Sequence, residues 1–146
     1  MLLPLRFRRT KTIGLITGGS SPAVKRHAFK LLRQVLEWQY LTYRIALNAK
    51  KNADAIGVAS YDYLMYSGYV QLAYHWLLME ETAAKALGAP KDTRAVGDDE
   101  FYKAKAQTAA FVFDHLLPRT KSHKDTMFTP IDTVMGMKPE DFSFDY

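Results

Sequence analysis

Few residues in this sequence are spaced for metal binding. In helical bundles, di-iron sites are built from histidines that follow a glutamate by three residues. The chain has four histidines: His27, His75, His115 and His123. The residues three positions before them are Val24, Leu72, Val112 and Thr120. Glu80 and Glu81 stand where an apolar stretch turns polar, so we expect a solvated helix end there. The sequence predicts no metal site.

The sequence supports nucleophilic catalysis no better than it supports metal binding. The chain has no cysteine, so thiolate nucleophiles, thiolate metal sites and disulfides are excluded. Ser67 and His75 are about two helical turns apart and project to a similar side, so they could lie near each other. A serine nucleophile also needs a strained turn and an oxyanion hole, and neither signature is present. We therefore expect Ser67, beside Gly68, to serve helix packing, and we predict no catalytic residue.

A glycine pair, Gly18-Gly19, interrupts the segment TIGLITGGSSP (residues 12–22) after a short β-like run. The full glycine fingerprint and the lysine of a phosphate-binding loop are missing. We interpret the segment as a flexible linker that ends in a helix cap. Ser21 is the expected N-cap and Pro22 the first helical residue.

Composition and charge indicate one domain whose N-terminal part is basic. The 146 residues are 48% apolar and carry a net charge of +5, and no acidic residue precedes Glu37. A basic segment can contact nucleic acid or an anionic membrane, but a basic leader followed by a solvated helix face is the reading that we favour. We expect residues 1–21 to be a leader and linker, residues 22–146 to be the domain, no nucleic-acid partner, and a cytoplasmic location.

The central element is an apolar stretch, Val58–Met79. Its apolar residues fill more than half of a helical circumference, which is typical of a helix that other helices surround. Asp62, Gln71 and His75 argue against a membrane span of this length. The helix should continue to Leu87, with Gly88 as its C′ residue.

Further helices are expected on both sides of this stretch. An amphipathic helix is predicted from Pro22 to about Lys51, and another from Phe101 to Leu117, where Pro118 should stop it. A charged connection, 119–126, leads to a short helix capped by Thr129. The tail offers Phe142, Phe144 and Tyr146 as anchors onto the bundle or another chain. The predicted fold is all-α: three long helices, a short fourth helix and an aromatic tail.

Two charged residues fall on apolar faces of these helices. Lys105 projects close to the middle of its helix's apolar arc, and Asp62 shares a side with Tyr69. A buried charge needs a partner or must reach solvent. One interpretation is that Asp62 and Lys105 pair between helices, and the other is that each points outward at an edge of the bundle.

The aromatic enrichment predicts packing or interface residues rather than a reactive site. A channel for an apolar ligand is the alternative. The candidates for packing or an interface are Asp62, Tyr66, Gly68, Tyr69, Trp76, Tyr102, Lys105 and Phe142.

Two segments resemble a known family. The first runs from Tyr63 to Trp76 as YLMYSGYVQLAYHW, and the second from Phe101 to Pro118 as FYKAKAQTAAFVFDHLLP. Their order is similar to the extra C-terminal helical domain of a subset of acyl-CoA dehydrogenases. The likeness covers about residues 22–142.

The resemblance implies an accessory domain of an FAD-dependent acyl-CoA dehydrogenase, and hence a link to fatty acid metabolism. In that family the flavin, the acyl-CoA pocket and the catalytic base belong mainly to the upstream domains. We therefore expect no cofactor in this chain, no activity from it alone, and a dehydrogenase core or a homo-oligomer as partner. The alternatives are a self-associating helical module without a flavoenzyme and a small acyl-chain-binding protein.

Overall fold

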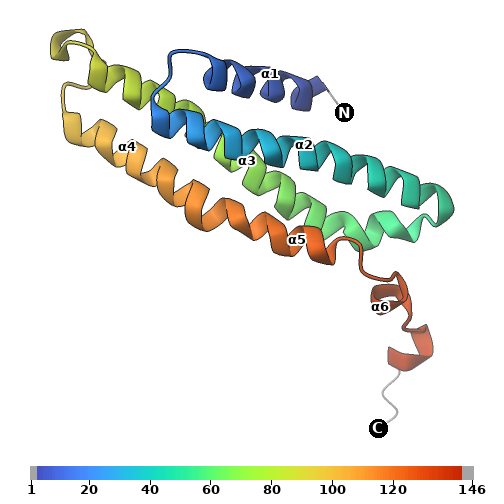
Figure 1. Ribbon diagram of the computed structural model, residues 1–146. Coiled ribbons are helices and arrows are strands. Elements are labelled where there is room, and N and C mark those ends of the chain that lie inside the picture. The colour runs from blue at the N-terminus through green and yellow to red at the C-terminus, as the bar shows by residue number, and fades with distance from the viewer. Residues whose placement is uncertain (1–2, 143–146) are drawn as a thin grey trace.

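The computed structural model describes the backbone of residues 3–142 and the side chains of residues 9–142. It consists of helices and turns, with no strand among the described residues, which confirms the all-α prediction. Figure 1 shows long helices side by side, with a short C-terminal segment at one end. The helices are α1 (Leu3–Thr17), α2 (Pro22–Lys51), α3 (Asp54–Gly88), α4 (Asp99–Phe111), α5 (Thr120–Thr126) and α6 (Asp132–Met135).

Helices α2 and α3 form a hairpin whose ends follow local rules. The Ser21 hydroxyl accepts a hydrogen bond from the Val24 N–H, and Pro22 opens the helix, as predicted. Asn52 ends α2, and its side chain accepts from the Asp54 N–H at 2.9 Å. The turn between the helices is therefore shorter than the interval between Lys51 and Val58 that separates the two predicted helices.

Helix α3 is the centre of the bundle. It runs between α2 on one side and α4 and α5 on the other (Figure 1). Tyr66, Val70, Ala73 and Leu77 are fully buried along one face and pack with Leu31 and Val35 of α2, Phe113 and other apolar residues in one core. Burying this apolar surface is the main force that holds the three long helices together.

The helix predicted to stop at Pro118 does not stop there. A π turn (Val112–Leu116) and a 3₁₀ turn (Leu117–Arg119) join α4 to α5. The Leu117 N–H donates to the Val112 carbonyl, five residues back. Such a wider turn is one of the recognised ways in which a helix accommodates a residue that cannot donate an N–H. The expected charged connection, 119–126, is thus mostly helix α5, which packs on α3.

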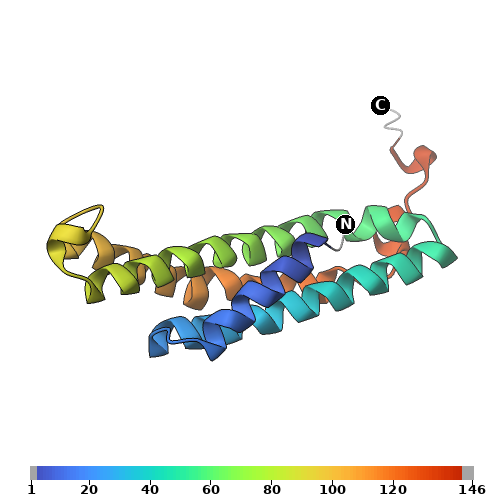
Figure 2. The ribbon, with the colours of Figure 1, turned by 90° about the horizontal axis from the view of Figure 1, so that it is seen from above.

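The basic leader also differs from the prediction. The β-like run expected after Thr12 is instead the last part of helix α1. Thr12 and Leu15 are buried, and Figure 2 shows α1 crossing obliquely over α2. Burial of these side chains overrides the weak local preference for an extended chain. The expected break at Gly18-Gly19 is present, and it lets the chain turn back into α2.

The C-terminal segment is more open than the rest. The predicted helix with Thr129 as cap is a single turn, Asp132–Met135, without a side-chain cap. Phe142 closes a 3₁₀ turn and is 61% exposed, so it does not anchor the described part of this chain. Phe144 and Tyr146 lie outside the described residues. No described helix is long and apolar enough to span a membrane.

Candidate functional site

A buried hydrogen-bonded pair joins α2 to α3. The His27 Nδ1 lies 2.8 Å from the Glu80 Oε2, and both side chains are almost fully buried. The His27 ring stacks on Phe113 at 4.4 Å between centroids. The expectation that Glu80 would be a solvated helix end is therefore wrong. Sequence reasoning missed this pair because its members are far apart in the chain and because Glu80 adjoins the polar Glu81.

The His27 pair lacks the features of a reactive centre. Its second ring nitrogen, Nε2, is buried and has no hydrogen-bond partner. A general base must reach the proton it abstracts, and this nitrogen does not face solvent. Three His, Asp or Glu side chains do not come together anywhere in the described part of the chain in a way that could hold a metal ion. The pair is best explained as a polar link inside the core.

Asp62 pairs with His123 rather than with Lys105. The His123 Nδ1 lies 2.9 Å from the Asp62 Oδ1, and each side chain is 17% exposed. Tyr69 stacks on the His123 ring with centroids 5.8 Å apart. The interpretation in which Asp62 pairs with Lys105 is therefore wrong. Helix α5, which was expected to be a connection, brings His123 to Asp62.

The Lys105 ammonium is stabilised by two aromatic rings. Its ammonium lies 5.9 Å from the Trp76 ring centroid and 5.1 Å from that of Phe101. The faces of aromatic rings attract cations at such distances. Lys105 and Trp76 are both half-buried, so they join α4 to α3 near the surface.

Tyr66 forms the hub of a polar network between α2 and α5. Its hydroxyl donates to the Gln34 Oε1 at 2.7 Å and to the Glu37 Oε2 at 3.0 Å. Lys124 of α5 donates to the other Glu37 oxygen at 2.7 Å. Burial, followed by the Glu37 charge, raises the pKa of Tyr66 well above its usual value. The phenol stays protonated and holds the helices in register.

Tyr102 and Arg94 fasten the loop between α3 and α4. The Tyr102 hydroxyl accepts from the Val96 N–H at 3.1 Å. The Arg94 guanidinium donates to the Leu87 and Ala89 carbonyls and to Asp99. The hydrogen bond from Arg94 to the Asp99 carboxylate lowers the pKa of Asp99. Tyr102 is thus a packing residue, and sequence reasoning missed Arg94 because a loop arginine carries no periodic signal.

Ser67 and His75 do not form a catalytic pair. The Ser67 hydroxyl donates to the Leu64 carbonyl at 2.8 Å, within its own helix. The His75 Nε2 lies 3.3 Å from the Gln71 side-chain nitrogen. Each polar group is therefore engaged locally, within its own helix.

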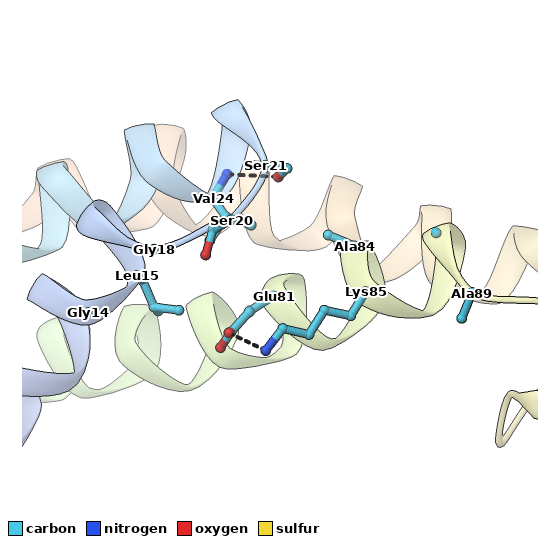
Figure 3. A pocket seen from close by; sticks show the side chains of 12 residues that line it. Gly14, Leu15, Gly18, Ser20, Ser21, Val24, Glu81, Ala84, Lys85 and Ala89 are labelled. Atoms are coloured by element: carbon cyan, nitrogen blue, oxygen red, sulfur yellow. Dashed lines mark hydrogen bonds and ion pairs between the residues drawn. The ribbon is translucent and has the colours of Figure 1, made fainter.

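A hollow of about 620 Å³ lies where α1, α2 and α3 meet. Figure 3 shows Gly18 and Ser21 on one side and Glu81 with Lys85 on the other. Ser21 already caps α2, and Lys85 is paired with Glu81 at 2.6 Å. A carboxylate in the hollow and a cation already neutralised do not suit a phosphate or a dinucleotide. The residues of this hollow therefore do not fit a flavin cofactor.

Two helix faces remain uncovered. The outer face of α3 comprises Gly57, Tyr61, Leu64, Gly68, Leu72, His75 and Met79, all exposed. The outer face of α2 comprises Phe29, Arg33, Leu36, Tyr40, Tyr43 and Leu47, also all exposed. Gly68 was predicted to let another helix approach, but a Cβ built on it meets no atom within 4 Å. No helix of the described chain occupies that position.

Apolar grooves flank the outer face of α3. One, of about 590 Å³, lies between α2 and α3 and is lined by Ile45, Ile56 and Leu64 among others. The second, of about 460 Å³, lies between α3 and α4 beside Met79 and Phe101. Large apolar surfaces on a soluble domain commonly mark interaction sites. The candidate functional site is therefore this pair of exposed surfaces.

Comparison with known families agrees with this description. The family model for acetyl-CoA dehydrogenase C-terminal-like domains matches residues 10–138. No curated protein and no solved structure gives a match. The matched range takes in the second half of α1 and all of α2 to α6. The chain therefore belongs to the family of acetyl-CoA dehydrogenase C-terminal-like domains.

Proposed function

We propose that this chain is an accessory helical domain that associates with the FAD-containing core of an acyl-CoA dehydrogenase and has no activity alone. The observation that carries the proposal is the family match over residues 10–138. The polar contacts of the bundle support it. His27, Asp62, Tyr66 and Arg94 all serve to join helices or fasten loops.

In this proposal the flavin and the acyl-CoA are bound by the core. The hollow beside Gly18 has a poor donor set for phosphates, because Glu81 lines it and Lys85 is paired. The other grooves beside α3 are lined mostly by apolar side chains. The chain would act by covering and stabilising the core.

The outer face of α2 is the surface that we assign to the core. Phe29, Tyr40 and Tyr43 are each more than half exposed on it. Arg33 lies within the face and Arg44 beside it, with the Arg44 guanidinium 5.8 Å from the Tyr40 ring. Tyrosine and arginine are the residues that most often dominate binding energy at interfaces. This combination suits a partner surface that is apolar and acidic.

Co-expression with an acyl-CoA dehydrogenase from the same genome that lacks such a domain tests the proposal. We expect the two to co-purify and the complex to show flavin absorption. Tyr40→Glu should abolish co-purification because it places a charge in the centre of the face. The matched control is Gln107→Glu, which adds one charge at an exposed position on α4. Separate elution of the two wild-type proteins, or acyl-CoA oxidation by the isolated chain, would show the proposal to be wrong.

A second candidate is an acyl-chain-binding protein, favoured by the groove between α2 and α3. The groove is about 590 Å³ in volume and is lined by Ile45, Ala46 and Leu64 among others. Mass spectrometry of the purified chain under denaturing conditions tests it. A stoichiometric fatty acid that Ala46→Trp removes would support this candidate, and its absence would reject it.

A further inference from the structure

We propose that the chain forms a two-fold symmetric dimer in which the outer face of α3 packs antiparallel on the same face of a second copy. Gly68 lies at the crossing point. The inference goes beyond the proposed association with a dehydrogenase core, because it concerns a different face and a different partner.

The outer face of α3 is a continuous stripe. Its members recur every three or four residues from Gly57 to Met79, so they share one side of the helix. At 1.5 Å per residue the stripe is about 33 Å long. Tyr61 is 66% exposed and Leu64 is 67% exposed. A helix surface of this length and apolarity is typical of a helix–helix interface.

The stripe is symmetric about Gly68. Leu64 and Leu72 lie at equal distances before and after it in the sequence, and so do Tyr61 and His75, and Gly57 and Met79. In an antiparallel pair centred on Gly68, Leu64 therefore meets the partner's Leu72. Tyr61 meets the partner's His75, and Gly57 receives the partner's Met79. A two-fold interface requires this reciprocity, in which each residue and its counterpart exchange roles.

The side chains complement one another in size across this axis. A Cβ at Gly68 would meet nothing within 4 Å, and the same holds for Gly57. Two helix backbones can therefore approach closely at Gly68. The gap at Gly57 suits methionine, which is flexible enough to fill irregular spaces. Tyr61 and His75 can stack or share a hydrogen bond.

Charge favours a second copy on α3 and opposes it on α2. The stripe on α3 contains no Asp, Glu, Lys or Arg. Two copies of a chain with a net charge of +5 can therefore meet there without placing like charges in contact. The outer face of α2 contains Arg33 and is bordered by Arg26 and Arg44. Self-association on that face would bring these cations together.

The C-terminal segment extends the same interface. Figure 2 shows residues 132–142 leaving the bundle near the start of α3, on the side of α3 away from α2. Val134, Met135 and Met137 are all more than half exposed on this segment. The antiparallel register brings the partner's Met79 opposite Gly57, and Met79 lines the apolar groove between α3 and α4. The segment therefore has an apolar groove of the partner within its path.

Sedimentation equilibrium of the full chain tests the dimer. We expect a dimer at micromolar concentration, and we expect Gly68→Glu to weaken it about 100-fold or more, because it buries two like charges at the axis. Gly68 is exposed within a helix and glutamate is the better helix former, so the variant should keep the helical content and have a urea midpoint at least as high as that of the dilute wild-type monomer. Gln107→Glu is the control that adds the same charge elsewhere.

Single cysteines test the register, because the native chain has none. Gly68→Cys should form a symmetric disulfide under mild oxidation, since residue 68 faces itself across the axis. Leu64→Cys and Leu72→Cys should each crosslink poorly alone but efficiently when mixed. Ser122→Cys, exposed on α5, gives the background of random collisions.

Three results would overturn the proposal. The first is a monomer at 100 µM, on the order of a hundred times the concentration at which a micromolar complex is half formed. The second is a dimer that Gly68→Glu leaves intact. The third is crosslinking of Leu64→Cys with itself at the rate of the Leu64→Cys and Leu72→Cys mixture, which would indicate parallel helices. Loss of core binding with Tyr40→Glu and a dimer that persists would separate the two proposals.

Discussion

The Nδ1 of His27 lies 2.8 Å from the Oε2 of Glu80 inside the core, where α2 crosses α3. The His27 ring also stacks on Phe113. The pair therefore also contacts the π turn that follows α4. A buried pair is costly to desolvate and costly to break, but it need not add net stability. What it contributes is a fixed position of α2 along α3, because apolar side chains alone tolerate several arrangements.

Removal of His27 alone should be strongly destabilising. His27→Leu leaves the Glu80 carboxyl buried without its partner, which costs about 3–5 kcal/mol of unfolding free energy. The double variant His27→Leu/Glu80→Met replaces both groups by apolar side chains and should lie within about 1 kcal/mol of the wild type. Urea unfolding of dilute protein followed by circular dichroism measures both. Equal losses in the single and double variants would contradict the role of the pair.

Lys105→Met should have little effect. The ammonium lies over the Trp76 and Phe101 rings, and at such a partly exposed site the contact is worth about 0.5–1 kcal/mol. A loss of several kcal/mol would instead indicate that Lys105 neutralises a buried acid.

Double-mutant cycles separate the two possible partners of Asp62. Asp62→Asn combined with Lys105→Met should be additive. Asp62→Asn combined with His123→Gln should show a coupling energy of about 0.5 kcal/mol or more, since these side chains touch at 2.9 Å. Urea unfolding of the single and double variants provides the measurement.

Helix type and helix ends could be predicted from the sequence because their causes are local. Apolar periodicity marks α2, and Ser21 with Pro22 marks its start. Asp98 precedes α4, and its side chain accepts the Glu100 N–H, as expected of an aspartate at a helix start. These features depend on residues within one or two turns, which a sequence displays directly.

Partners across helices could not be predicted in the same way. Asp62 has a polar partner, as its position on an apolar face required, but the partner is His123 and not Lys105. The wrong partner follows from the prediction that the helix ends at Pro118. In the structure a π turn and a 3₁₀ turn continue the helical path from α4 into α5. Residues 120–126 then lie beside α3 instead of in a loop. Which side chains meet depends on this long-range geometry, which periodicity does not contain.

Tyr66 should make the fold sensitive to alkali. Its pKa in the folded chain is raised above the usual value of 10.0 by burial and by Glu37. The unfolded chain therefore loses the phenol proton first, so the stabilising contribution is complete below pH 10 and is lost as the pH rises above it. At pH 11 the loss from this group amounts to about 1.4 kcal/mol.

Comparison with Tyr66→Phe isolates this effect from the titration of lysines. The stability difference between wild type and Tyr66→Phe should be smaller at pH 11 than at pH 8 by about that amount. Urea unfolding at the two pH values gives the difference. A constant difference would mean that Tyr66 ionises normally in the folded chain.

Two glycines in and after α1 test whether the basic leader is a packed helix. A Cβ at Gly14 would meet nothing within 4 Å, so Gly14→Ala should stabilise α1 by about 0.5–1 kcal/mol through helix propensity. A Cβ at Gly18 would lie 2.9 Å from the Gly14 carbonyl oxygen, so Gly18→Ala requires the backbone to shift and should bring no such gain. Hydrogen exchange of the α1 amides measures both variants. If residues 3–17 were an unfolded leader, neither substitution would change amide protection, whereas a helix held by Thr12 and Leu15 against α2 responds to Gly14→Ala alone.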